Sequence, residues 1–251
     1  MLRRALATLA LLVPVESRAQ AIGAPPAASS VPFQVGERLA YEVRFGKLRV
    51  GEGVMELIDS ESIRGRDTWH TRFRIRGGVP FYRVDDVLES WIDKAEFHSL
   101  RFVQDLEEGG RLRERRYEFF PDRKVFREND GEEEPSVEQP LDDGSFLYFV
   151  RTLPLEVGAT YTFDRYFRPD RNPVVVKVLG RERVKVPAGT FETLVLQPVI
   201  KSKGVFSERG EARVWISDDP RRIMVQMKTK TKIGSLNLYL TSVRLTTAPT
   251  G

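Results

Sequence analysis

Apolar and polar residues alternate along most of the chain after residue 32. Segment 39–45 places Leu39, Tyr41, Val43 and Phe45 on one face and its polar or small residues on the other. Segments 69–76 and 223–232 show the same period of two. This period is typical of antiparallel strands that bury one face and expose the other. The pattern predicts an all-β fold of about a dozen strands.

Short turns rich in glycine separate these strands. Gly109-Gly110 and Gly234-Ser235 each stand between two alternating segments, which predicts two hairpin turns. The stretch Pro187–Thr190 predicts a third turn. Gly51-Glu52-Gly53 lacks the third glycine and the helix of a dinucleotide-binding loop, so we interpret it as another hairpin turn.

One segment near the middle of the chain departs from the strand pattern. Residues 128–140 are acidic and predict a solvated loop, and Asp142-Asp143 offer a helix N-cap. Residues 145–153 then predict a short helix that ends before Pro154. Since Phe146 and Phe149 belong to a helix that is apolar over much of its surface, we expect it to be buried. It would act as a plug for the sheet or as a lid over a cavity.

The two halves of the chain resemble each other. Four short motifs recur in the same order about 122 residues further along: Val35-Gly36 and Val157-Gly158, Thr68–Thr71 and Thr190–Thr193, Trp91–Asp93 and Trp215–Ser217, and Val103-Gln104 and Val225-Gln226. The spacing predicts an internal duplication in which residues 33–127 and 155–247 form equivalent antiparallel meanders, joined by residues 128–154. We expect the two meanders to form one barrel, half-barrel or sandwich with a shared core, because each half alone would have a marginal core.

The first 21 residues have the pattern of an export signal. Arg3 and Arg4 precede an apolar run over residues 5–15, and Ala19-Gln20-Ala21 supplies small residues for a cleavage site. The apolar run is too short to span a bilayer. Residues 22–32 are rich in alanine, proline and serine and predict a flexible leader. The sequence therefore predicts a periplasmic or secreted protein with a cleaved signal peptide and no lipid anchor or transmembrane segment.

The composition excludes several kinds of chemistry. The 251 residues include no cysteine, which rules out disulfides, thiolate metal sites and thiol catalysis. With two histidines a His-rich metal site is also excluded, and we predict no metal and no cofactor. The net charge of +4 comes partly from the arginines of the signal segment, so we predict no nucleic-acid partner.

No catalytic constellation stands out. The pairs Asp142-Asp143 and Asp218-Asp219 both stand where aspartates cap turns or helices. Asp85, Asp86 and Glu89 could line a glycan cleft near Trp91, but acids on a solvated strand face are common. His70 stands among Arg72, Arg74 and Arg76 in a stripe that could meet anionic groups or simply face solvent. Because serine-elbow, HExxH and phosphate-loop motifs are missing from the sequence, we predict no catalytic residues.

Several longer motifs resemble a known family. Residues 33–41 (FQVGERLAY), 186–193 (VPAGTFET), 214–219 (VWISDD) and the central segment 142–154 resemble the bacterial family called domain of unknown function 3108. The similarity covers about residues 33–245. It implies an exported all-β protein without an assigned activity, and it implies no catalytic residues.

Two hypotheses about function follow. The first is a periplasmic protein that binds or carries an apolar or lipid-like ligand inside the curved sheet, beneath the central helix. It predicts a connected cavity lined by Phe45, Trp69, Phe146, Phe149, Phe163, Phe191 and Trp215. The second is a non-enzymatic structural or assembly factor that presents a sheet edge, or the basic strand 111–116, to another envelope protein. It predicts a packed interior.

Overall fold

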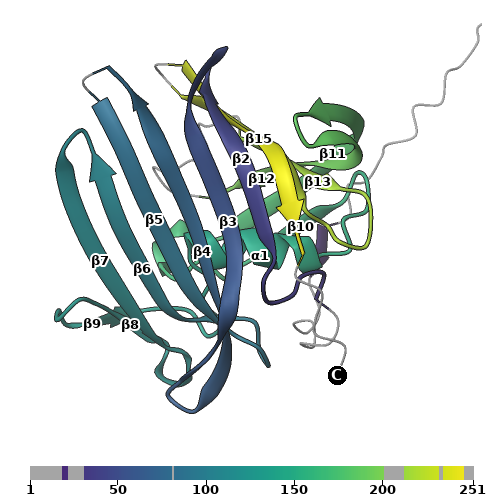
Figure 1. The fold of residues 1–251 in the computed structure, drawn as a ribbon. Helices are drawn as coiled ribbons and strands as arrows, with labels where there is room; N and C mark the ends of the chain where they lie inside the picture. Colours follow the sequence, from purple (N-terminus) through teal and green to yellow (C-terminus); the bar gives the residue numbers. More distant parts are fainter. Residues whose placement is uncertain (1–18, 22–30, 81, 201–211, 232–233, 246–251) are drawn as a thin grey trace, which may run out of the picture.

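In the part of the chain that the structure describes, one curved sheet of 15 strands surrounds one α-helix (Figure 1). This computed structural model describes residues 19–21, 31–80, 82–200, 212–231 and 234–245. Most of the predicted signal peptide and leader therefore lies outside the described residues. The strands are β1 (Ala19–Ala21), β2 (Arg38–Phe45), β3 (Leu48–Ile63), β4 (Arg66–Val79), β5 (Tyr82–Asp93), β6 (Ser99–Glu108), β7 (Arg111–Phe120), β8 (Val125–Glu128), β9 (Glu133–Pro135), β10 (Thr160–Phe163), β11 (Val174–Val186), β12 (Gly189–Val199), β13 (Arg213–Ser217), β14 (Met224–Thr231) and β15 (Gly234–Arg244). The helix α1 spans Asp143–Thr152, and the described residues also form 3₁₀ turns at Pro121–Arg123 and Pro169–Arg171.

The order of strands places the two halves of the chain side by side. The order is β1-β10-β11-β12-β13-β14-β15-β2-β3-β4-β5-β6-β7-β8-β9, and every neighbouring pair is antiparallel except β1 with β10. The halves join where β15 pairs with β2, with Leu238 opposite Val43. Among the described strands β1 and β9 form two separate edges, so the sheet is open. The predicted all-β fold with a short helix is confirmed. Of the three predicted arrangements, namely barrel, half-barrel and sandwich, the open sheet corresponds to the half-barrel.

The hairpin turns follow from local backbone chemistry. Gly109 and Gly110 both have positive φ (58° and 79°), as the turns that suit twisted hairpins require. The predicted turn at Gly51-Glu52-Gly53 is wrong, because all three residues lie inside β3. A Cβ atom on Gly51 would lie 2.2 Å from the carbonyl oxygen of Arg76, so the glycine is required for close strand contact rather than for a turn.

Both halves contain the same turn, before β2 in the first half and before β10 in the second. Gly36 (φ 86°) donates its N–H to the carbonyl of Leu57 at 2.8 Å, and Gly158 (φ 84°) donates to Val178 at 2.9 Å. These contacts join the first two strands of each half and agree with the predicted duplication. The duplication itself stays a prediction.

A second hydrogen bond also occurs in both halves. The indole N–H of Trp91 donates to Glu61 at 2.9 Å, and that of Trp215 donates to Glu182 at 2.8 Å. In this register Thr193 takes the place of Thr68, since their hydroxyls donate to the carbonyls of Glu182 and Glu61. The sequence motifs had aligned Thr68 with Thr190 instead.

The helix α1 begins with a complete capping box. The carboxylate of Asp142 accepts from the backbone N–H groups of Gly144 and Ser145, and the Ser145 hydroxyl accepts from the N–H of Asp142. The helix is buried over most of its length and packs against β4 and β5. The prediction from the sequence is confirmed to within two residues. Figure 1 shows α1 lying inside the curve of the sheet.

A buried ion pair holds α1 to both halves of the sheet. Arg151, 1% exposed, donates through two guanidinium nitrogens to the carboxylate of Glu37 at 2.6 and 2.9 Å. Its guanidinium also donates to the carbonyls of Pro32 and Arg221, at 3.3 and 3.0 Å. The rings of Phe33 and Tyr148 lie within 5.5 Å of the same group. One side chain of the helix thus connects the segment before β2 with the loop between β13 and β14.

Removal of one partner of this pair is expected to destabilise the fold strongly. Arg151→Met leaves the Glu37 carboxylate buried without its counter-charge, at a cost of about 3–5 kcal/mol. The control is Arg183→Met, which breaks the exposed Arg183–Glu192 pair and should cost no more than about 0.5 kcal/mol. Urea unfolding followed by circular dichroism measures both costs. Similar costs for the two variants would contradict the role assigned to Arg151.

Asp142 is expected to make stability depend on pH. Burial raises its pKa to about 6, above the value near 4 of an aspartate in the unfolded chain. The folded state therefore binds this proton more tightly, so stability increases as the pH falls from about 6 to about 4 and decreases as the pH rises. Asp142→Asn keeps a good N-cap without an ionisable group. Relative to this variant, the unaltered protein should become more resistant to urea as the pH falls from 7 to 4.5. A difference in unfolding free energy between the two proteins that does not change with pH would contradict the assignment.

Candidate functional site

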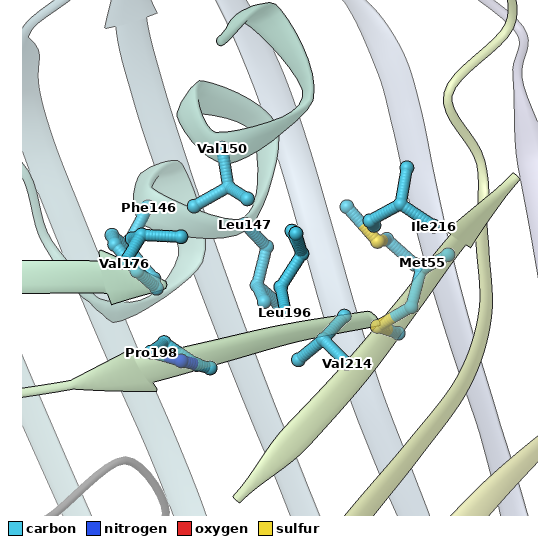
Figure 2. A pocket seen from close by; sticks show the side chains of 10 residues that line it. Met55, Phe146, Leu147, Val150, Val176, Leu196, Pro198, Val214 and Ile216 are labelled. Atoms are coloured by element: carbon cyan, nitrogen blue, oxygen red, sulfur yellow. The ribbon is translucent and has the colours of Figure 1, made fainter. Parts of the chain in front are cut away.

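The interior beneath α1 is filled by side chains. The space left there is about 10 Å³, no more than one water molecule needs (Figure 2). Residues from the helix and from both halves of the sheet line it: Met55, Phe146, Leu147, Val150, Val176, Leu196, Pro198, Val214, Ile216 and Met224. A lipid chain does not fit in this space without displacing the core.

Four of the seven residues predicted to line a cavity are packed in the core. Phe146 borders the small space, and its ring lies 6.4 Å from that of Phe163. Phe149 contacts Phe163 with ring centroids 5.1 Å apart. Trp69 packs against Phe97, which in turn packs against Phe149. These aromatic side chains connect α1 to both halves of the sheet and act as core residues.

The other three predicted residues lie elsewhere. Phe191 is half-buried at the margin of the core. Trp215 points to the outer face, where the ammonium of Lys228 lies 5.2 Å from its ring. Phe45 stands at the end of β2 and is 38% exposed. The structure therefore does not gather the seven residues around one space.

Exposed apolar side chains collect at the hairpin end of the concave face. Phe45 and Leu48 pair across the β2–β3 hairpin, and Val79 and Tyr82 pair across the β4–β5 hairpin. They continue the inward-facing alternation that buries Tyr41, Val43, Trp69 and Phe73 further down the same strands. Leu48 is 62% exposed and Tyr82 is 49% exposed. We call these four residues the apolar rim; their hairpins point to the top of Figure 1.

Arginines of β7 stand on the same face. Arg111, Arg113 and Arg115 alternate with outward-facing residues and continue the inward face that buries Tyr117 and Phe119. The β6–β7 hairpin lies next to the apolar rim, because a Cβ atom on Gly109 would lie 2.8 Å from the Tyr82 ring. Together the apolar rim and these three arginines form what we call the tip face.

An acidic pair lies between the rim and the arginines. Asp86 stands opposite Ile75 on one side and Leu106 on the other, so it shares the concave face. Burial, with a smaller contribution from Glu108, raises the pKa of Asp86 to about 6. Glu108 pairs with Arg113 across the hairpin. This end of the concave face is therefore apolar at the β2–β3 and β4–β5 hairpins and charged from Asp86 of β5 across β6 to β7.

The arginine stripe of β4 lies on the outer face and is matched by acids. Arg72 pairs with Glu89 at 2.7 Å, and Arg74 pairs with Asp85 at 2.7 Å and lowers the pKa of that carboxyl. The sheet register therefore supplies counter-charges for these arginines from the neighbouring strand. This agrees with the solvated-face interpretation of the stripe.

The paired aspartates have structural partners. Asp142 caps α1, and the pKa of Asp143 is raised mainly by burial. Asp219 accepts from the Arg221 side chain and the Ser217 hydroxyl, and Asp218 pairs with Arg181. Among the described residues one group of three could hold a metal ion, namely Asp59, Glu61 and His70 on the outer face.

Sequence reasoning missed the tip face for a clear reason. The inward alternation of Phe45 was visible in the sequence, but the length by which the hairpins extend past α1 was not. The sequence therefore placed Phe45 in the lining of an internal cavity and did not single out Leu48, Val79 or Tyr82. The basic run in strand 111–116 was the one signal that pointed to this region.

Comparison with known proteins places the chain among proteins without an assigned activity. The family model described as "Protein of unknown function (DUF3108)" matches residues 40–241. None of the curated proteins matches the sequence. Among the described residues, no helix has the length and apolar character that crossing a membrane requires.

Solved structures with a similar fold are distant in sequence. The β-barrel-like protein of domain of unknown function DUF1849 from Brucella abortus is 13% identical, with a TM-score of 0.57 over 86% of this chain and 99% of that one. A protein described as a lipoprotein from Parabacteroides distasonis is 11% identical, with a TM-score of 0.37 over 86% and 99% of the two chains. A protein described as exported, with a YmcC-like fold, from Bacteroides fragilis is 10% identical, with a TM-score of 0.32 over 86% and 98%. The first of these similarities supports the fold.

Proposed function

The chain belongs to the DUF3108 family of proteins of unknown function, and from its structure we propose that it binds an amphipathic, lipid-like molecule in the cell envelope. The binding surface in this proposal is the tip face rather than the space beneath α1. The export pattern of residues 1–21 supports an envelope location. The single observation that carries the proposal is the exposure of the apolar rim on the concave side of the sheet.

Contact of the exposed apolar rim with water is unfavourable in free energy, and a ligand or partner that covers the rim removes this contact. Four large apolar side chains on two neighbouring hairpins form an exposed patch, and such patches mark interaction sites on soluble proteins. Covering apolar surface contributes about 25 cal/mol per Å². The packed interior gives an acyl chain no room beneath the helix, so the proposal places the chain on the rim.

The neighbouring charges suggest which end of the ligand binds where. Arg111, Arg113 and Arg115 point to the concave side and stand across β6 from the apolar strands. Guanidinium groups bind carboxylates and phosphates through two parallel hydrogen bonds. An amphipathic ligand could therefore place its acyl chain on the apolar rim and its anionic head group beside the three arginines of β7.

Truncation of the rim is expected to abolish binding of a fatty-acid probe. Leu48→Ser combined with Tyr82→Ser removes the two most exposed side chains of the rim and should weaken binding of cis-parinaric acid by at least tenfold. The matched control is Leu112→Ser, which removes a 75% exposed leucine from the outer face at the same end of the sheet. Fluorescence titration of the probe measures all three proteins. An equal loss in the control, or no saturable binding to the unaltered protein, would contradict the proposal.

A second candidate function rests on an open strand edge. β8 pairs only with Tyr117–Phe120, so the part of β7 from Arg111 to Arg115 has no neighbouring strand on that side among the described residues. Such an edge can accept a strand from another protein, although edge arginines also serve to discourage this pairing. This arrangement supports an assembly factor that contacts another envelope protein.

Charge reversal tests the second candidate. Arg113→Glu combined with Arg115→Glu keeps β7 exposed but inverts its charge, so it should remove a crosslinked envelope partner. The reversal Arg181→Glu on the other half serves as control, because Arg181 is also exposed on a strand. Crosslinks that survive the double reversal would exclude the β7 edge as the contact surface.

A further inference from the structure

His70 lies on the outer face of the sheet, in the centre of a group of carboxylates. The residue is 8% exposed, and its ring stacks on that of Trp91 with centroids 4.3 Å apart and planes 8° from parallel. Its Nδ1 atom lies 3.2 Å from a carboxylate oxygen of Glu61 and 3.4 Å from one of Asp59. The three donor atoms all lie within 4.8 Å of one another.

A β-bulge brings Asp59 into this group. The register between β3 and β4 shifts between Leu57 and Asp59, so that Asp59 stands opposite His70 and Leu57 opposite Thr71. Without the extra residue Asp59 would be on the concave face with Leu57. Bulges of this kind often redirect side chains at functional sites.

Two atoms that face each other in this group have no hydrogen-bond partner among the described residues. These are Nδ1 of His70 and Oδ1 of Asp59, and both atoms are buried. Buried polar atoms in folded proteins are nearly always paired, since an unpaired one costs about 1–3 kcal/mol. A proton or a cation bound between Nδ1 of His70 and Oδ1 of Asp59 would give both atoms a partner.

The other side of the imidazole faces a third carboxylate. Nε2 lies within hydrogen-bond distance of Glu89, at 3.3 Å, and the Glu89 carboxylate also accepts from Arg72 at 2.8 Å. A carboxylate accepts a hydrogen bond from Nε2 in the tautomer that has its proton on this nitrogen, which leaves Nδ1 unprotonated. In the neutral imidazole Nδ1 then presents a lone pair towards two carboxylates, which only a cation or a second proton can stabilise.

This arrangement has the form of a metal site with its supporting residues. A histidine that binds metal through one nitrogen usually donates from the other to a carboxylate, as His70 does to Glu89. Glu61 is held in turn by the indole N–H of Trp91 at 2.9 Å. In a tetrahedral zinc site with ligand bonds near 2.1 Å, donor atoms are about 3.4 Å apart. The contacts of 3.2 and 3.4 Å to Nδ1 agree with this spacing.

The second half of the sheet shows which parts of the group are structural. There the Trp215–Glu182 hydrogen bond repeats the Trp91–Glu61 bond. However, Val195 stands opposite Trp215 where His70 stands opposite Trp91, and Gly180 takes the place of Asp59. The tryptophan–glutamate bond therefore supports both halves, whereas the imidazole and the second carboxylate are present in one only.

We propose that Asp59, Glu61 and His70 bind a divalent zinc-class metal ion on the outer face of β3 and β4. One nitrogen and two carboxylate oxygens match the ligands of zinc and related first-row metals. Calcium takes six to eight oxygen ligands, so this group suits it poorly. The half-exposed side chain of Asp59 leaves the site open to solvent, which provides water for the remaining coordination position.

Calorimetry with zinc chloride on the full chain, without a histidine tag and after chelator dialysis, tests the proposal. We expect one Zn²⁺ per chain, and at least tenfold tighter binding than for Mg²⁺. Asp59→Asn and His70→Gln should each weaken zinc binding by at least tenfold. The Asp59 side chain is half-exposed, so Asp59→Asn leaves the packed core unchanged, and circular dichroism checks the folds of both variants.

Glu182→Gln is the matched control for Glu61→Gln. Each variant alters the acceptor of one tryptophan N–H, but only Glu61→Gln removes a proposed ligand. Glu61→Gln should weaken zinc binding, and Glu182→Gln should leave it within twofold. The proposal is overturned if zinc does not bind stoichiometrically, or if Asp59→Asn binds it as tightly as the unaltered chain. Nitrogen NMR showing His70 doubly protonated at pH 7.5, with no change on zinc addition, would identify a proton in place of the metal.

Discussion

The buried pair between Arg151 and Glu37 constrains the rest of the structure. Burying a guanidinium and a carboxylate costs several kcal/mol for each ion, and this cost is offset only when the geometry is good and the remaining donors are used. Here the two groups share two hydrogen bonds and two carbonyls accept further ones, so that Nε of Arg151 is the one guanidinium nitrogen without a partner among the described residues. The pair therefore specifies one position of α1 relative to both halves of the sheet.

The fixed position of α1 determines where ligands can bind. The helix directs Phe146, Leu147 and Val150 into the space between the halves and fills it. An interior of this kind contributes to stability and leaves no room for a guest molecule. The exposed features are then the tip face, where the strands extend past the helix, and the outer face, where charged residues of neighbouring strands meet.

Much of the fold could be predicted from the sequence because strands and hairpins depend on local patterns. The alternation in residues 39–45, the glycine pair at the β6–β7 turn and the aspartate cap of α1 each determine a nearby backbone conformation. The openness of the sheet could not be predicted in this way, since it depends on which distant strands pair.

The candidate sites were harder to predict, because they depend on the register in which neighbouring strands pair. A shift in the alignment of β4 with β12 gives Leu194, and not Phe191, the buried position that Trp69 holds in the first half. The bulge after Leu57 moves Asp59 to the same face as His70, although strict alternation would separate them. A displacement of one residue changes the face of a strand residue, and a single sequence does not show such displacements.

The Arg151 contacts unite both halves into one cooperative unit. Native-state hydrogen exchange at increasing urea concentrations tests this cooperativity, with amides of β4 and β12 as reporters of the two halves. The most protected amides of both strands should exchange through the same global opening, with one free energy and one dependence on urea. Opening of one half at a lower free energy, while the other stays protected, would contradict it.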